Sequence, residues 1–172
     1  MFQPGEWPRL AAVLLSSLLG GCAALSAMLP DGEPIQVSEV RRLLSCNSDG
    51  PQARLSLLAD REAVRAWQHG HNVDLIGVDP LPAASAYVLV EMGVRLSAGY
   101  GVAVSRDARL DGGVAHLNAS LFSPDPGQVT AQVVTSPCVL VALPQGSSVR
   151  AVELRDPAGS LLGRADAVAA VQ

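Results

Sequence analysis

The second half of the chain, from residue 86 to residue 166, repeats one pattern that strongly limits its fold. Short apolar segments alternate with clusters of glycine, proline and aspartate, which are typical of turns. In the first segment Tyr87 and Leu89 alternate with Val88 and Val90, which is the period of a β-strand. The predicted strands cover residues 86–97, 100–106, 114–122, 131–144, 148–156 and 161–166. Such a series without long helices predicts an antiparallel β structure.

Two prolines refine this prediction. Pro137 interrupts the segment 131–144. Because proline cannot donate a hydrogen bond to a neighbouring strand, we expect this strand to lie at an edge or to contain a bulge. Pro157 begins a Pro-Ala-Gly turn between the last two segments, which predicts that they form a hairpin.

The part before residue 86 adds a predicted hairpin and one helix. Residues 35–46 are predicted as a first strand and residues 53–58 as the strand that returns from it. Asp60 is a favourable N-cap, and Gly70 is a stop signal for the helix that follows. We therefore expect a mainly β (α+β) fold, an antiparallel sheet or sandwich of about seven to nine strands with one packed helix near residues 60–69.

The N-terminus has the features of a bacterial secretion signal. Residues 10–19 read LAAVLLSSLL, which is too short to span a membrane, where about 20 residues are needed, but suits the apolar region of a signal peptide. Gly20, Gly21 and Cys22 follow directly, and this string resembles the lipobox of bacterial lipoproteins. The resemblance implies cleavage before Cys22 and a lipid on its sulfur. The alternatives are an ordinary signal peptide with an incidental cysteine, or a short N-terminal anchor.

Lipidation would divide the chain and place it in the cell envelope. The expected parts are a signal peptide at 1–21, a lipidated tether at 22–34, a single β-rich domain at 35–166 and a tail at 167–172. Acyl chains such as palmitate would then hold the protein on a membrane. The residue after Cys22 is Ala23, not the aspartate that often retains lipoproteins in the inner membrane. The resemblance therefore implies the periplasmic face of the outer membrane of a Gram-negative cell.

Two cysteines remain once Cys22 is assigned to lipidation. Cys46 and Cys138 would lie in an oxidising compartment, where an even pair predicts one disulfide. Two buried free thiols are the alternative, since free cysteine is often buried. Neither cysteine lies in a spacing that is typical of a zinc site.

Composition and motifs exclude several functional classes. The chain has a net charge of −4 and no basic stripe, so no nucleic-acid partner is expected. His69, His71 and Asp74 form a metal-like cluster, but a strong zinc site needs three or four ligands, and we interpret the segment as a solvated loop. No cofactor is therefore expected. The chain contains no Gly-x-Ser-x-Gly motif and no convincing carboxylate pair, so we do not expect an enzyme.

The order of motifs in the second half carries a family resemblance. An apolar strand leads into a glycine turn that ends in tyrosine, and a later Thr-x-Pro element leads into an apolar strand that closes with Leu-Pro. The residues concerned are Val88–Val90, Gly93, Ser97, Gly99, Tyr100, Thr135, Pro137 and Leu143–Pro144. Over residues 57–145 this order resembles the C-terminal domain of the protease-complex subunit PrcB family. Ala98 and Cys138 depart from the glycine and the aromatic residue that are usual there.

The resemblance implies a non-enzymatic lipoprotein that associates with a secreted or surface protease and supports its maturation or stability. Each motif residue then either maintains the fold or contacts the partner. Gly99 would allow a positive φ or a bulge, Tyr100 would pack on a strand face, and Pro137 would end a ladder. Two alternatives stay open. One is a loop-based protease inhibitor, because Ser97–Tyr100 faintly resembles a loop of chagasin-type inhibitors, and the other is a structural envelope lipoprotein.

Overall fold

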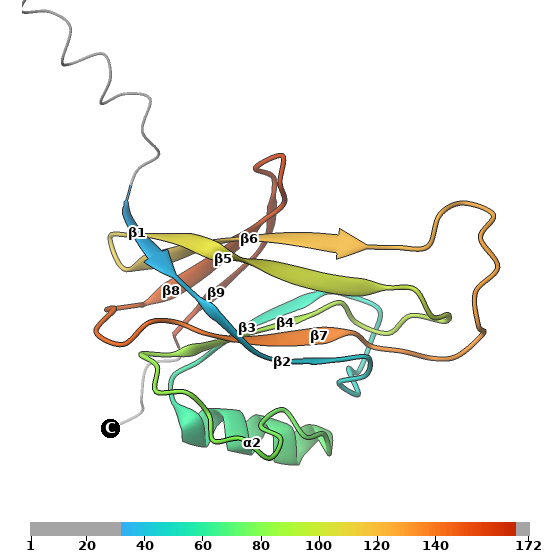
Figure 1. Cartoon of the computed structure of the whole chain (residues 1–172), viewed down its shortest axis with the longest axis horizontal. Coiled ribbons are helices and arrows are strands. Elements are labelled where there is room, and N and C mark those ends of the chain that lie inside the picture. The colour runs from blue at the N-terminus through green and yellow to red at the C-terminus, as the bar shows by residue number, and fades with distance from the viewer. Residues whose placement is uncertain (1–31, 168–172) are drawn as a thin grey trace, which may run out of the picture. The chain divides into compact units, whose positions relative to one another are not determined.

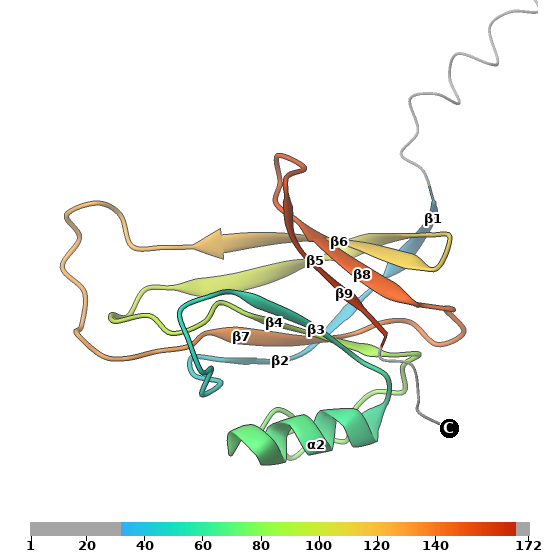
Figure 2. The same ribbon diagram turned by 180° about the vertical axis from the view of Figure 1, so that it is seen from behind.

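The computed structural model describes residues 32–167; Cys22, the signal peptide and most of the predicted tether lie outside the described residues. The described part is mainly β, with nine strands in two sheets and one helix, as predicted (Figures 1 and 2). The five-stranded sheet has the order β1 (Glu33–Gln36), β5 (Gly101–Asp111), β6 (Val114–Phe122), β8 (Ala151–Arg155), β9 (Leu161–Asp166). The four-stranded sheet has the order β2 (Ser38–Leu43), β7 (Cys138–Ala142), β4 (Tyr87–Glu91), β3 (Arg54–Leu58).

A valine- and alanine-rich core lies between the two sheets. Its side chains come from alternate positions of each strand, such as Val88 and Val90 of β4 and Val139 and Val141 of β7. The five-stranded sheet contributes mainly small residues of β5, β6 and β8. Alternation therefore predicts this core correctly, because every second residue of a strand points to the same face.

A second core lies on the other face of the four-stranded sheet, which helix α2 (Arg61–His71) covers (Figure 1). Tyr87 and Leu89 point to this side, as do Cys138 and Leu140. All five residues of β4 and all five of β7 are buried, because both faces of this sheet are covered. The described part thus has three layers: sheet, sheet and helix.

The predicted first strand at 35–46 is divided between the two sheets. At Val37 the chain leaves β1, which pairs with β5, and enters β2, which pairs with β7. The predicted hairpin between 35–46 and 53–58 is therefore wrong, because β3 pairs with β4 instead. A turn signal reports only that the chain changes direction, and the partners are selected by burial of both faces of β4 and β7. β1 also begins at Glu33, inside the predicted tether.

Helix α2 begins as predicted and ends later. The Asp60 side chain accepts a hydrogen bond from Ala63 N at 2.8 Å, which confirms the N-cap. The helix continues through Gly70 to His71 and ends at Asn72, whose left-handed backbone (φ 51°) forms the C-cap. The predicted stop at Gly70 is wrong, because glycine lowers helix propensity by only about 1 kcal/mol and the cap outweighs it.

The segment predicted as a strand at 131–144 is mostly loop. Only Cys138–Ala142 forms a strand, and Thr135 and Ser136 make isolated bridges before it. Pro137 thus precedes β7, which lies inside its sheet and not at an edge. The β8–β9 hairpin is confirmed, but β8 runs parallel to β6, a pairing that the expected antiparallel sheet did not include.

None of the helical structure in residues 32–167 has both the length and the apolar character needed to cross a membrane.

Candidate interaction surface at the loop end

The predicted motif residues gather at one end of the domain, where two loops meet. Gly93, Ser97, Gly99 and Tyr100 lie between β4 and β5, while Thr135 and Pro137 lie in the long segment between β6 and β7. Figure 1 places both segments at its right-hand side, beyond the ends of the strands that they connect. We call this region the loop end.

Backbone hydrogen bonds fasten the two loops to each other. Arg95 and Thr135 exchange both of their backbone bonds, with N–O distances of 2.7 and 2.9 Å. The Thr135 hydroxyl donates to Ser97 O at 3.3 Å, and Ala98 N donates to Ala131 O at 2.9 Å. Ser97 and Thr135, one from each motif, are therefore 38 residues apart in the sequence but adjacent in space.

Two glycines are required by the geometry of the first loop. Gly93 has φ +76°, and a Cβ there would approach Gln52 O to 2.5 Å. Gly99 has φ +96°, and a Cβ would approach Pro124 Cγ to 2.9 Å. The positive φ expected for Gly99 is confirmed. Pro137 stands where the β4–β7 pairing ends, and its carbonyl accepts a hydrogen bond from Met92 N at 2.8 Å.

Arg95 holds the base of the first loop, a role that the motif comparison missed. Its guanidinium donates to Pro51 O at 2.8 Å and to Met92 O at 2.6 Å. The same group lies over the Tyr100 ring, with 5.6 Å from Cζ to the ring centroid. Tyr100 also packs against the core between the sheets, as expected. The available signal was an arginine two residues after Gly93, inside the segment predicted as a strand at 86–97.

A buried cluster of polar side chains and one disulfide lies next to the loop end, where Ser136 precedes Pro137. Cys46 and Cys138 form a disulfide, as predicted, and both are fully buried. Ser136 Oγ accepts hydrogen bonds from the backbone nitrogens of Cys46 at 3.0 Å and Ser48 at 3.4 Å. The Ser48 hydroxyl donates to Glu91 Oε1 at 2.8 Å, and Glu91 is only 2% exposed. Sequence reasoning treated Glu91 as a strand position and missed this cluster.

The metal-like cluster of the sequence analysis does not lie wholly in a loop. His69 and His71 belong to the last turn of α2, so the solvated-loop interpretation is wrong for them. The His71 ring stacks on Trp67 at 3.9 Å between centroids, and its Nδ1 lies 2.9 Å from Trp67 O. Among residues 32–167, no three histidine, cysteine, aspartate or glutamate side chains are placed to hold a metal ion.

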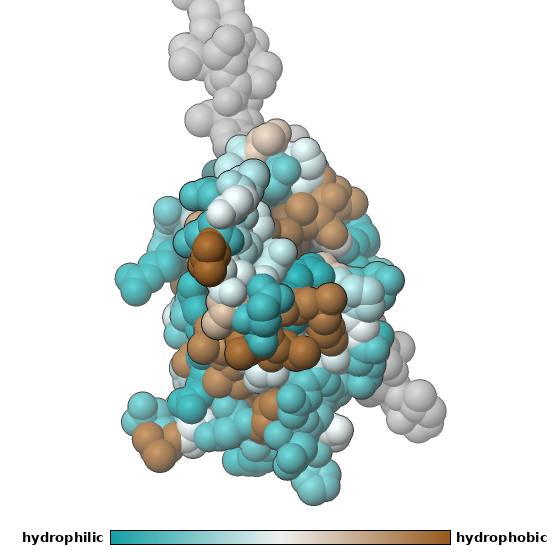
Figure 3. Space-filling view, turned by 90° about the vertical axis from the view of Figure 1, so that its right-hand side faces the viewer, coloured by the Kyte–Doolittle hydropathy of each residue, from teal (hydrophilic) through white to brown (hydrophobic). Residues whose placement is uncertain are grey.

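Exposed apolar side chains collect around the motif loops. Figure 3, which views the molecule from the loop end, shows a brown apolar area bordered by polar residues. Val129 is 97% exposed and Leu96 is 76% exposed, so neither side chain contributes to the core. The exposed apolar residues of the two loops and the adjoining end of β6 are Leu96, Leu121, Phe122, Val129, Val133 and Val134. We call these six side chains the loop-end surface.

A comparison with protein families matches the part of the chain that contains both loops of the loop end. The family model described as PrcB C-terminal matches residues 86–144, which include β4, β5, β6, β7 and both motif loops. The match begins after α2, so the expected resemblance over residues 57–85 is not part of it. No curated protein and no solved structure matches the chain. Residues 86–144 are therefore similar to the family described as PrcB C-terminal, and the domain that contains them is PrcB-like.

Proposed function

We propose that this protein is a lipid-anchored accessory module of the cell envelope that binds a secreted or surface protease through the loop-end surface. The observation that carries the proposal is the coincidence of two features at one place. The residues of the PrcB-like motifs and the exposed apolar side chains lie on the same end of the domain. We assign a binding role and no catalytic role to the chain.

The loop end has the physical properties of a protein-binding surface. Contiguous exposed apolar side chains bordered by polar residues mark interaction sites, because solvation of such an area is unfavourable. The backbone beneath is fixed by the Arg95–Thr135 bonds and the Cys46–Cys138 disulfide. A rigid scaffold lowers the entropy cost of binding. The family relationship supports a protease as the partner.

The anchor is proposed from the sequence. Cys22 follows the apolar stretch and the two glycines of a lipobox-like string. We expect cells fed a palmitate analogue to label the wild-type chain and not Cys22→Ala. Cys46→Ala is the matched control and should keep the label, because it removes a cysteine that lies in the folded domain. Equal labelling of the wild type and Cys22→Ala would exclude lipidation at this residue.

Binding is tested by site-specific photo-crosslinking in the native envelope. A photoreactive phenylalanine at Leu96 or Val134 should capture a protease, because both side chains project from the loop-end surface. Val78 is the matched control, since it is an apolar residue that is 99% exposed in the link after α2. Capture of the same proteins from all three positions, or of no protease from Leu96 and Val134, would contradict the proposal.

Loss of the protein should also lower the level of the captured protease. Deletion of the gene is expected to reduce the amount of that protease in the envelope, and the Cys22→Ala chain should not restore it. An unchanged level and activity of every envelope protease would exclude the accessory role. If instead the purified protein inhibits papain-like proteases, the inhibitor alternative replaces this proposal.

A further inference from the structure

Along one of its two edges, strand β5 is paired with another strand over only part of its length. β1 pairs with Asp107–Leu110 and then ends, because the chain crosses to the other sheet at Val37. β5 continues to Gly101, and there it is paired only with β6 among the described strands. The first half of β5 is thus an open sheet edge beside the point where the chain changes sheets. We call residues 101–105 on this side the β5 edge.

The β5 edge presents backbone groups to whatever lies beside it. Val37 N donates to Arg106 O at 2.9 Å, so Arg106 faces the β1 side. By the β1 register, Ala108 and Leu110 face β1 as Arg106 does, so Arg109 and Asp111 face β6 at His116 and Val114. Alternation along β6 then directs Ser120 and Phe122 to Ala103 and Gly101, which leaves the N–H and C=O groups of Val102 and Val104 on the β1 side. Unpaired groups of this kind are a template for an added strand.

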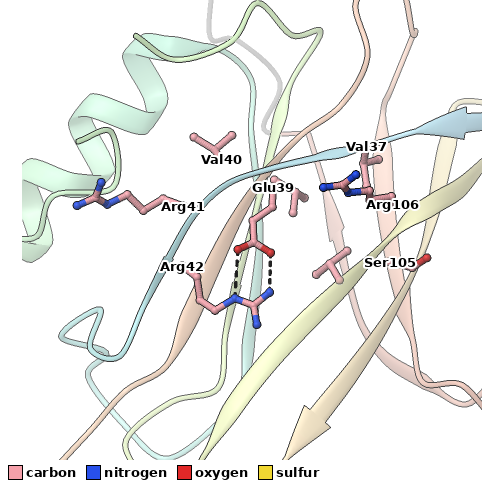
Figure 4. A pocket seen from close by; sticks show the side chains of 9 residues that line it. Val37, Glu39, Val40, Arg41, Arg42, Ser105 and Arg106 are labelled. Carbon is pink, nitrogen blue, oxygen red and sulfur yellow. Dashed lines mark hydrogen bonds and ion pairs between the residues drawn. The ribbon is translucent and has the colours of Figure 1, made fainter. Parts of the chain in front are cut away.

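A cavity of about 600 Å³ lies along the β5 edge (Figure 4). One wall is β5 at Val104–Arg106, and the other is the Val37–Arg42 segment of the neighbouring sheet. Both strands depart from regular pairing here, β2 between Glu39 and Arg41 and β5 between Val104 and Ala108. Bulges occur preferentially at sheet edges and binding sites, where they redirect side chains. Both irregularities thus lie in segments that line this cavity.

The cavity combines an apolar floor with a positively charged border. Val37, Val104 and Val141 supply apolar lining, and the charged lining residues are three arginines and one glutamate. Glu39 is held by Arg42 in a paired contact with N–O distances of 3.2 and 2.5 Å.

The other two arginines differ in their contacts. Arg41 reaches Asp74, 3.9 Å away, outside the cavity lining. Arg106 is exposed, and its side chain makes no hydrogen bond or ion pair within residues 32–167. Among the described residues that line the cavity, Arg106 therefore supplies a positive charge that no carboxylate pairs, on a chain whose net charge is −4.

We propose that the β5 edge takes up an extended, acidic segment of the protein partner as an additional strand. The backbone of the segment would pair with Val102 and Val104. Because alternate side chains of a strand share one face, every second side chain would enter the cavity, the apolar ones over the valine floor and a carboxylate beside Arg106. Strand addition of this kind combines backbone hydrogen bonds with side-chain pockets for selectivity. The inference deepens the proposed function, because Tyr100 of the loop end directly precedes Gly101 of the β5 edge.

The experiment uses the full chain in detergent and a labelled peptide, Ac-TVTETVT-NH2, in which two valines and one glutamate share a face, with fluorescence anisotropy as the readout. We expect saturable binding that weakens about fivefold when the glutamate is replaced by lysine, in line with the value of exposed ion pairs. Arg106→Glu should weaken binding by a similar factor. Arg65→Glu on α2 is the matched control and should leave it unchanged, since Arg65 does not line this cavity.

Backbone pairing is tested separately from charge. N-methylation of alternate peptide residues removes the N–H groups of one edge, so one methylated set should lose binding at least tenfold and the other set should keep it. Val104→Pro should also abolish binding, because the Val104 N–H faces the open edge and not β6. Its thermal unfolding is measured alongside, and Ser105→Ala serves as a folded β5 variant. Equal effects of both methylated sets would overturn the inference.

The remaining outcomes separate this inference from the proposed function. Photo-crosslinking at Leu96 with no peptide binding would overturn the strand addition and leave the accessory role standing. Peptide binding with no protease captured would overturn the accessory role and leave the strand addition standing. Concentration-dependent self-association that Val104→Pro abolishes would also overturn the inference, because the occupant of the β5 edge would then be a second copy of this chain.

Discussion

The two sheets differ in how many of their faces are covered, and this difference explains where polar groups matter. The four-stranded sheet is covered on both faces, by the other sheet and by α2, and it holds the disulfide, Glu91 and Ser136 in buried positions. The outer face of the five-stranded sheet carries the charged group around Glu153, with Arg155 and Arg164 still 39% and 46% exposed. Buried polar groups cannot exchange their partners for water, whereas exposed ones can. We therefore expect the removal of polar groups to lower the free energy of unfolding strongly in the four-stranded sheet and weakly in the five-stranded sheet.

Removal of the disulfide should have the largest effect. Cys46 and Cys138 are separated by 92 residues, and a loop of that size corresponds to about 4 kcal/mol of stability in the chain-entropy model. The double variant Cys46→Ser/Cys138→Ser should lose about that much free energy of unfolding in guanidinium titrations. The control Cys22→Ala should not change it. A loss below about 1 kcal/mol would mean that the covered sheet does not depend on this cross-link.

Gly93→Ala should have the next largest effect. Its positive φ and the approach of a Cβ to Gln52 O at 2.5 Å both oppose a side chain. Because the obstacle is backbone, we expect a loss of about 3 kcal/mol in the free energy of unfolding. Gly127→Ala is the matched control, with φ +84° and open space around its Cα, and it should lose only about 1 kcal/mol. Equal losses would show that the 50–52 segment moves away freely.

Ser136→Ala should have an intermediate effect. Its hydroxyl accepts from the backbone nitrogens of Cys46 and Ser48, and the variant leaves the Ser48 N–H without this acceptor, while the Cys46 N–H keeps the Ser136 carbonyl at 2.9 Å. We expect a loss of about 2 kcal/mol in the free energy of unfolding. Ser120→Ala on β6 makes the comparison with the five-stranded sheet and should stay within about 0.5 kcal/mol of the wild type. Similar losses for both serines would remove the distinction between the two sheets.

The sequence was sufficient for features that depend on neighbouring residues. Alternation at Tyr87–Val90 assigned the faces of β4, and Asp60 marked the start of α2. Both signals are local, because a strand alternates every two residues and a cap bonds to the following turn. The cysteine count also predicted the correct pair.

Features that depend on distant partners were not predictable from the same reasoning. The crossing at Val37 has no turn signal, because no glycine or proline lies between Ile35 and Leu43, and the pairing of β2 with β7 joins segments about a hundred residues apart. The two bulges at the β5 edge and the contacts of Arg95 also arise only when the loops and both sheets are assembled. Propensity does not encode such contacts, since tertiary packing decides them.

The mildest expected effect is a pH dependence on the open face of the five-stranded sheet. A hydrogen bond from Arg155 lowers the pKa of the Glu153 carboxyl from its ordinary value, with further help from Arg164 and His116, while partial burial acts in the opposite direction. Because the pKa is lower in the folded state, the carboxylate contributes stability above its unfolded pKa of about 4.3. That contribution is lost as the pH falls through the lower, folded value. Thermal unfolding of the wild type should therefore decline below about pH 5 more steeply than that of Glu153→Gln. Parallel curves for the two proteins would show that the charges of this face stabilise the sheet no more than separate ions in water do.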